Sequence, residues 1–401
     1  MGSIHLEYTY VFYRRTDMKL KIGLLARIII AILGAVALGQ FVPEWFVRIA
    51  ATFNGIFGGF LSFVVPLIII GFIAPGIAQL GSGSGKLLGL ATFFAYFSTI
   101  IAGVLAYFVA SSVLPNFIDA KNSSDISNPN DFLATAFFEI EMIPVMDVMA
   151  ALLFAFIVGV GMTVVKSDVL KRGFEEFNLI IEKLISAIII PLLPFHIFGI
   201  FLNMTFAGQV AKILSVFAVV FILIIILHWV MLLIQYSTAG MLNGKNPFKL
   251  IKTMLPAYFT AIGTQSSAAT IPVTLRQAKK TGATDKVTDF TIPLFATIHL
   301  SGSTITLVSC AIGVMLMNGM EFSFASMIGF ILMLGVTMIA APGVPGGAVM
   351  AAIGLLGTML GFDETMIALM IALYMAQDSF GTATNVTGDG ALALIVDKFS
   401  K

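Results

Sequence analysis

The first 243 residues alternate between long apolar stretches and short polar ones. Each apolar stretch approaches or exceeds the roughly 20 residues that a helix needs to cross a bilayer core. The pattern therefore predicts membrane-spanning helices over 22–42, 48–79, 87–114, 146–165, 177–207 and 210–243. Residues 115–145 are rich in Asn, Asp, Ser and Pro, and they indicate an aqueous loop.

After residue 247 the segments become shorter and carry polar residues at their centres. Residues 257–272 and 338–348 hold Gly, Pro, Ser or Thr between apolar flanks, and 297–303 interrupts a further span. Non-helical backbone is tolerated at membrane depth only where protein or a water-filled cavity covers it. The first two segments therefore predict re-entrant hairpins.

Paired interrupted segments are the sequence sign of a transporter built from repeats. A weaker similarity in length and proline placement relates 64–71 to 188–199. We therefore expect an all-α integral membrane protein with inverted repeats.

The stretch 374–389 carries two carboxylates and an amide inside an otherwise apolar segment. Asp378, Thr382, Asn385 and Asp389 are spaced by four, three and four residues, which places them on one face of a helix. Ionisable groups at membrane depth usually face a protein interior and mark an ion or substrate path. This face is the candidate site, although a polar seam that only joins two helices is an alternative.

Composition narrows the class of protein. Hydrophobic residues make up 59% of the 401 residues and charged residues 11%, which excludes an ordinary soluble domain. A net charge of +1 gives no case for nucleic-acid binding. Cys310 is the single cysteine and the four histidines are scattered, so neither a disulfide framework nor a zinc site is expected. His196 and His228 lie in apolar runs and are expected to hydrogen-bond between helices.

Lysine and arginine positions predict the orientation. They gather before residue 22, near 166–172, between 245 and 286, and at the C-terminus, whereas the 115–145 loop holds one lysine among several acidic residues. By the positive-inside rule this loop is external and both termini are cytoplasmic. The first apolar run lacks a small-residue cleavage site and is expected to be a retained helix.

Three motifs resemble the dicarboxylate/amino acid:cation symporters, the family that includes the glutamate-transporter homologues. They are Thr270-Ile-Pro-Val-Thr274, the Gly-Val-Pro-Gly sequence at 343–346, and Asn385-Val-Thr-Gly-Asp389. The resemblance implies eight transmembrane helices plus two re-entrant helical hairpins in a homotrimeric, elevator-type transporter of a prokaryotic inner membrane. It also implies a cytoplasmic segment 1–21 and scaffold helices in 22–85 and 146–207. The transport domain would consist of a third helix in 86–145, which also holds an external loop, and of residues 208–401.

The resemblance implies a substrate site between the hairpin tips, where opened helix ends present N–H groups to an anion. Asp378 would bind the substrate's ammonium group. The other implied substrate contacts are Ser266, Ser267, Ser303, Gly343, Val344, Gly381, Thr382 and Asn385.

The resemblance also implies sodium as the coupling ion, with no other cofactor. The oxygens implied as ligands, mostly from the backbone, suit an alkali cation rather than a transition metal. They belong to Phe295, Thr297, His299, Ser301, Met338, Ile339, Ala341, Asn385 and Asp389, with Ser98 and Thr99 as further candidates.

Four positions depart from the family pattern. Ser301 stands where a cation-binding Asp is found, and His299 stands in place of an Asn. Gly381 and Gln265 occupy the positions that carry an Arg in carriers of acidic substrates. These departures resemble the sodium/serine-threonine branch most, and they predict symport of a small neutral amino acid.

Other functions would require features of a different kind. A carrier of acidic amino acids or dicarboxylates would need a second anion site, and a channel would need a continuous polar pore. An enzyme is not expected, because no nucleophile, base and orienting group occur together. Proton coupling stays open, because a His299 imidazole pointing toward Asp389 would let a proton replace one sodium, whereas one pointing away would contribute only its backbone oxygen.

Overall fold

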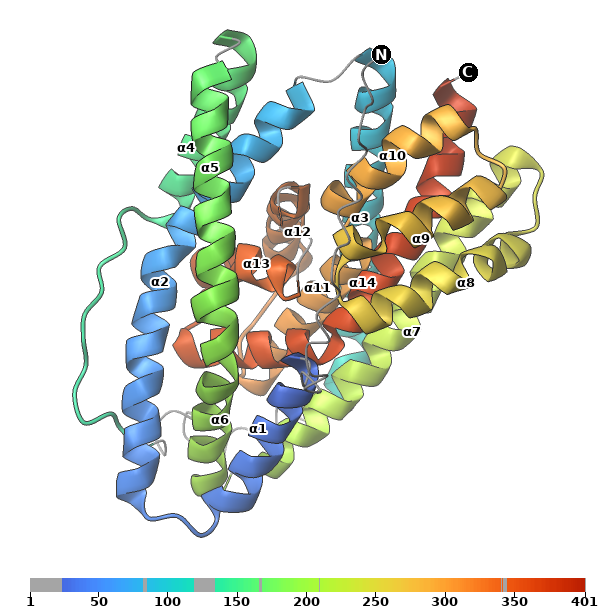
Figure 1. Cartoon of the computed structure of the whole chain (residues 1–401). Coiled ribbons are helices and arrows are strands. Elements are labelled where there is room, and N and C mark those ends of the chain that lie inside the picture. Colours follow the sequence, from blue (N-terminus) through green and yellow to red (C-terminus); the bar gives the residue numbers. More distant parts are fainter. Residues whose placement is uncertain are drawn as a thin grey trace, which may run out of the picture.

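The computed structural model describes residues 24–81, 85–118, 134–165, 168–208, 210–339, 341 and 345–400 (Figure 1). These residues form helices and connecting segments and contain no strand. The predicted segment 1–21 and residues 119–133 of the predicted loop lie outside the described part. The expected all-α fold is confirmed for the part that the structure describes.

The helices of the first half follow the apolar stretches closely. They are α1 (Leu24–Gly39), α2 (Glu44–Gly81), α3 (Gly85–Val113), α4 (Val148–Val165), α5 (Asp168–Leu184), α6 (Ile190–Phe206) and α7 (Val210–Asn243), with a short 3-10 turn Leu114–Asn116 after α3. Helix α5 begins nine residues before the predicted start at 177, because its amphipathic first turns continue the helix beyond the apolar run. A π-helical segment Ile185–Ile189 joins α5 to α6 directly before Pro191, where a proline disturbs the regular hydrogen-bond ladder.

The helices of the second half break where the sequence predicts interruptions. They are α8 (Pro247–Thr264), α9 (Ser267–Lys280), α10 (Asp285–Ile298), α11 (Ser301–Met317), α12 (Phe324–Ile339), α13 (Gly347–Leu360) and α14 (Glu364–Ser400). The breaks fall at Gln265 and Ser266, at His299 and Leu300, and between α12 and α13. In contrast, α14 is unbroken through its polar centre, which is almost entirely buried.

Helices α8 and α9 pack against each other as a hairpin, as the sequence predicts. Gln265 turns the chain with a left-handed backbone conformation, φ 53°, and Ser266 then caps α9 by accepting a hydrogen bond from the Ala269 N–H at 3.2 Å. At the open end, Lys245 Nζ donates to the Thr281 carbonyl oxygen at 2.7 Å. The start of α8 and the end of α9 therefore lie next to each other.

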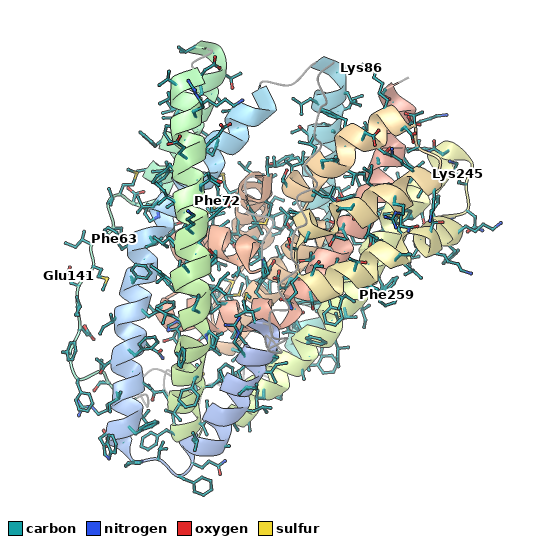
Figure 2. The ribbon with its side chains drawn as sticks, in the orientation of Figure 1. Phe63, Phe72, Lys86, Glu141, Lys245 and Phe259 are labelled. Carbon is teal, nitrogen blue, oxygen red and sulfur yellow. The ribbon has the colours of Figure 1, made fainter. Side chains whose placement is uncertain are left out.

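Six helical segments among the described residues are long and apolar enough to cross a membrane: Glu44–Ala78, Lys86–Asn116, Asp168–Phe206, Ile213–Asn243, Asp285–Met317 and Glu364–Ser400. Four shorter apolar helices include Ala26–Gly39 and Leu153–Val165, which lie in the first and fourth predicted spans. Large apolar side chains point outward from the bundle, for example Phe259 on α8, which is 65% exposed (Figure 2). Such a surface is typical of a protein surrounded by lipid.

Two packing groups are visible (Figure 1). Helix α2 packs on α4, α5 and α6, and α1 packs on α6. Helix α14 packs on α7, α8 and α11, and α3 packs on α11. Gly302 allows the close approach of α11 to α14, because a Cβ atom there would overlap the Gly381 carbonyl oxygen and lie 2.7 Å from Thr384 Cβ.

Candidate functional site

A buried pair of His299 and Asp389 lies where α10 gives way to α11. His299 Nδ1 is 2.8 Å from Asp389 Oδ1, and the two side chains are 0% and 1% exposed. The interruption at His299 and Leu300 ends α10 and lets the imidazole reach α14. The ring therefore points toward Asp389, the arrangement under which the sequence leaves proton coupling open.

The other ring nitrogen of His299 faces a polar cluster from three further elements. Ser98 Oγ on α3 lies 3.1 Å from His299 Nε2. Gln235 on α7 donates from Nε2 to Ser98 Oγ at 2.9 Å and lies 3.3 Å from both His299 Nε2 and Ser301 Oγ. The network that links these four residues to Asp389 joins α3, α7, α11 and α14. Gln235 is not among the site residues predicted from the sequence. The sign that could have indicated it is a single amide side chain within the apolar part of α7.

Gly388 makes room for this network. A Cβ atom at this position would lie 2.5 Å from Gln235 Oε1 and 3.0 Å from His299 Cε1. Any side chain would therefore push the glutamine or the imidazole out of place. The glycine of the Asn-Val-Thr-Gly-Asp motif thus allows α14 to approach the cluster.

The hydrogen bonding around Asp389 leaves one carboxylate oxygen open to a cation. Asp389 Oδ2 is buried and has no hydrogen-bond partner among the described residues. A bare carboxylate oxygen in a dehydrated site is costly, and a hard cation would remove that cost. Ser98 and Ser301 also bring their hydroxyls to the cluster, although Gln235 already contacts both.

The remaining predicted cation ligands either bond within their own helical segments or lie at the end of α12. Thr99 Oγ1 donates to the Ala95 carbonyl at 2.9 Å, and Thr297 Oγ1 donates to the Leu294 carbonyl at 2.7 Å, so both hydroxyls bond within their own helices. The Phe295 carbonyl accepts the His299 N–H at 2.9 Å. The residues that end α12 are Met338, which is buried, Ile339 and, after the helix, Ala341.

A second polar group surrounds Asp378, which is 4% exposed. Its Oδ2 accepts a hydrogen bond of 2.8 Å from the backbone N–H of Gly346, the residue that precedes α13. Tyr374, one turn earlier on the same face of α14, donates its hydroxyl proton to Ser303 Oγ at 3.1 Å. Asp378 therefore joins α14 to the second hairpin.

Asn385 provides the corresponding contact to α11. Its Oδ1 accepts from the N–H groups of Gly302 at 2.7 Å and Ser303 at 3.4 Å, and its Nδ2 donates to Ser303 Oγ at 3.0 Å. The first N–H groups of a helix have no partner within the helix, so Asn385 satisfies them from outside. Thr382 is buried on the same helix, and Gly381 faces Ser303 and Thr306.

The tip of the first hairpin contributes the predicted serines. Ser266 is occupied as the cap of α9, and Ser267 in the first turn is 4% exposed. Gly343 and Val344 of the second hairpin lie outside the described residues. The structure therefore brings Asp378, Asn385 and Ser303 into one group and Asp389, His299, Ser98 and Ser301 into another.

Two other histidines connect helices, as the sequence predicts. His228 Nε2 on α7 lies 3.0 Å from the Gly302 carbonyl oxygen. His196 Nδ1 on α6 lies 3.1 Å from the Asn54 side chain on α2.

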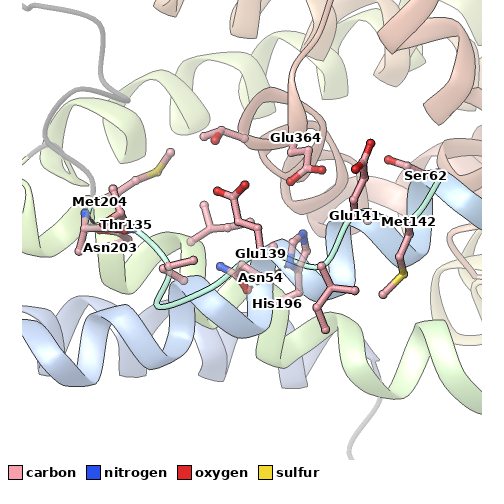
Figure 3. A pocket seen from close by; sticks show the side chains of 18 residues that line it. Asn54, Ser62, Thr135, Glu139, Glu141, Met142, His196, Asn203, Met204 and Glu364 are labelled. Atoms are coloured by element: carbon pink, nitrogen blue, oxygen red, sulfur yellow. Dashed lines mark hydrogen bonds between the residues drawn. The ribbon is translucent and has the colours of Figure 1, made fainter.

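A cavity of about 760 Å³ lies elsewhere in the molecule (Figure 3). It is bounded by α2, residues 134–142, α6 and the start of α14, with Glu139, Glu141 and Glu364 around it. None of the predicted site residues lines it. The candidate site is instead a closed, buried cluster.

The chain is similar in sequence to a known protein family and to several of its relatives. The sequence profile described as the sodium:dicarboxylate symporter family matches residues 24–399. Excitatory amino acid transporter 1 of Bos taurus is 31% identical over 241 residues, which are 59% of this chain and 44% of that protein. The serine/threonine transporter SstT of Streptococcus thermophilus is 24% identical over 392 residues, 94% of this chain and 96% of that protein. The match to the bovine relative therefore spans less than half of that protein's length.

Replacing Gln235 by leucine tests whether the buried cluster is cooperative. The change leaves Ser98, Ser301 and His299 Nε2 without the amide, so we expect a loss of about 1–3 kcal/mol in the free energy of unfolding. Thermal unfolding of the detergent-solubilised protein would measure it. The control is Gln377→Leu, since this buried amide reaches only the Leu373 carbonyl at 3.3 Å and Cys310 Sγ at 3.8 Å. Equal losses in the two variants would contradict a special role for Gln235.

Proposed function

Because the chain belongs to the sodium:dicarboxylate symporter family, we propose that it is a secondary active transporter for cation-coupled symport of a small neutral amino acid. Asp378 carries this proposal. Its carboxylate is buried, and one oxygen is held by the Gly346 N–H. A carboxylate offers about four acceptor positions, so the group retains capacity for a substrate ammonium.

The neutral character of the substrate is supported by the charges that surround Asp378. The buried polar residues of the described part include Asp, His, Asn, Gln, Ser and Thr but neither Lys nor Arg. A second carboxylate on the substrate would therefore find no cationic side chain and would lie near a negative charge. Gly381 and Gln265 supply no guanidinium. The Streptococcus relative is named a serine/threonine transporter, which also favours a neutral substrate.

We propose sodium as the coupling ion, bound by Asp389 with help from nearby hydroxyl and carbonyl oxygens. The unpartnered Asp389 Oδ2 supports this choice. Proton coupling is the second candidate, because His299 lies within hydrogen-bond distance of Asp389. Fewer sodium ions are expected than for relatives that carry a carboxylate where this chain has Ser301.

The proposal extends to architecture. Helices α1, α2, α4, α5 and α6 would form a scaffold that trimerises, and α3 with α7–α14 would form a transport domain that moves as an elevator. The packing of α3 and α7 on α11 and α14 supports this division. We place the protein in a prokaryotic inner membrane as a multi-pass protein in contact with lipid, with both termini cytoplasmic.

The purified protein in liposomes tests the substrate class. With an inward sodium gradient, we expect uptake of labelled serine, threonine or alanine to exceed uptake of aspartate and succinate, because the described residues hold no buried Lys or Arg to pair a second carboxylate. Liposomes without a gradient are the control. Better uptake of aspartate or succinate than of serine would contradict the neutral-substrate proposal.

Asp378→Asn tests the ammonium anchor. Asparagine keeps an oxygen that accepts the Gly346 N–H but removes the charge, so the hairpin contact survives while the ammonium loses its partner. We expect amino-acid binding to weaken by about 3–5 kcal/mol in calorimetry, with folding retained. The control is Asp397→Asn, whose carboxylate accepts from Thr284 Oγ1 at 2.6 Å near the end of α14. Unchanged affinity in Asp378→Asn would refute the assignment.

Ion substitution decides between the two coupling ions. At fixed pH, replacement of external sodium by choline should stop uptake, since Asp389 would lose the cation that neutralises it. Uptake measured under a pH gradient without sodium is the complementary assay. Transport that persists in choline but collapses without the pH gradient would assign the coupling to His299 and Asp389 instead.

A further inference from the structure

We propose that Tyr374 and Ser303 form a subsite for a hydroxyl group on the substrate's side chain, and that Tyr374 sets the preference for hydroxyl-bearing over purely aliphatic amino acids. The inference deepens the proposed function and rests on its assignment of Asp378 as the ammonium anchor. Tyr374 is not among the residues that the sequence singles out. Its place in the site follows from its contacts.

Tyr374 lies four residues before Asp378 and therefore on the same face of α14. The Tyr374 residue is 1% exposed, and its hydroxyl donates to Ser303 Oγ on α11 at 3.1 Å. Asp378 follows one turn later on the same helix face, so the two side chains project from α14 in the same direction. The phenol thus lies beside the group that would hold the substrate's ammonium.

The hydrogen bonds of the subsite can be counted for the substrate-bound state. A tyrosine hydroxyl has one proton and can also accept, and a serine hydroxyl has one proton and two acceptor positions. When an ammonium group pairs with Asp378, the phenol proton stays on its bond to Ser303 Oγ, which also accepts from Asn385 Nδ2 at 3.0 Å. Both acceptor positions of Ser303 are then filled. Its own proton is left to donate, and the Tyr374 oxygen is left to accept.

This pair of free positions matches one kind of side chain. A substrate hydroxyl can donate to the Tyr374 oxygen and accept from the Ser303 hydroxyl at the same time. In an amino acid such as serine that hydroxyl is on Cβ, close to the ammonium that Asp378 holds. A methyl group would leave both positions unpaired, which is unfavourable in a buried site. A carboxylate has no proton to donate to Tyr374 and would face the charge of Asp378.

Competition against labelled serine in proteoliposomes tests the subsite. We expect the wild-type protein to bind serine about tenfold or more tightly than alanine or O-methylserine, because alanine lacks both hydrogen bonds and O-methylserine lacks the donor. Tyr374→Phe should reduce the serine-over-alanine ratio about tenfold, toward equal affinity. Ser303→Ala is the second variant and should reduce the same ratio.

Tyr258→Phe is the matched control. Tyr258 is also buried, at 4% exposed, but it packs on Trp229 with ring centroids 5.1 Å apart, on α8 rather than α14. The serine-over-alanine affinity ratio of the Tyr258→Phe variant should equal that of the wild type. An undiminished ratio in Tyr374→Phe, or wild-type affinity for O-methylserine equal to that for serine, would overturn the inference while leaving amino-acid transport intact. Absence of uptake of any amino acid by the wild type would instead contradict the proposed function and this inference with it.

Discussion

Broken helices in an apolar environment leave backbone groups without partners, and α14 satisfies them. The breaks before α11 and α13 expose N–H groups that water would bind in a soluble protein. Asn385 accepts the N–H groups that open α11, and Asp378 accepts the N–H group that opens α13. Asp389 holds the imidazole of His299, the residue at which α10 ends. One face of one continuous helix therefore joins the helix ends at two breaks, the one between α10 and α11 and the one between α12 and α13.

The same groups that stabilise the breaks are those suited to bind a solute. Asp378 keeps acceptor capacity after its contact with Gly346, and Asp389 keeps an oxygen with no partner among the described residues. Buried carboxylates are stable only where positive charge or donors surround them. The N-terminus of α13 supplies a helix dipole to Asp378, and His299 supplies a donor to Asp389. Each carboxylate therefore has some of its acceptor positions filled. The positions that remain open can accept a hydrogen bond or contact a cation.

Much of this arrangement follows from the sequence, for identifiable reasons. The breaks at 265–266 and 299–300 were predictable because Gly, Ser and Pro interrupt apolar runs there. The polar face of α14 was predictable because the spacing of Asp378, Asn385 and Asp389 matches helical periodicity. In contrast, Gln235 is a single amide in the apolar part of α7, and a lone residue carries no register. Tyr374 lies one turn before Asp378 on α14, but the sequence does not show that its hydroxyl contacts Ser303. The direction of the His299 ring was equally undetermined, because the same residue fits a helix break whether its ring points toward α14 or away from it.

The residues at 299 and 301 have a joint consequence for the charge of the cluster. Ser301 brings a neutral hydroxyl, and His299 brings an imidazole that can donate to Asp389. Gln235 bridges these positions through Ser98, His299 and Ser301 with a neutral amide. In a low-dielectric site, each carboxylate needs a positive charge or a donor close to it. Among the described residues of the cluster Asp389 is the one carboxylate, and it is there that we propose the coupling cation to bind.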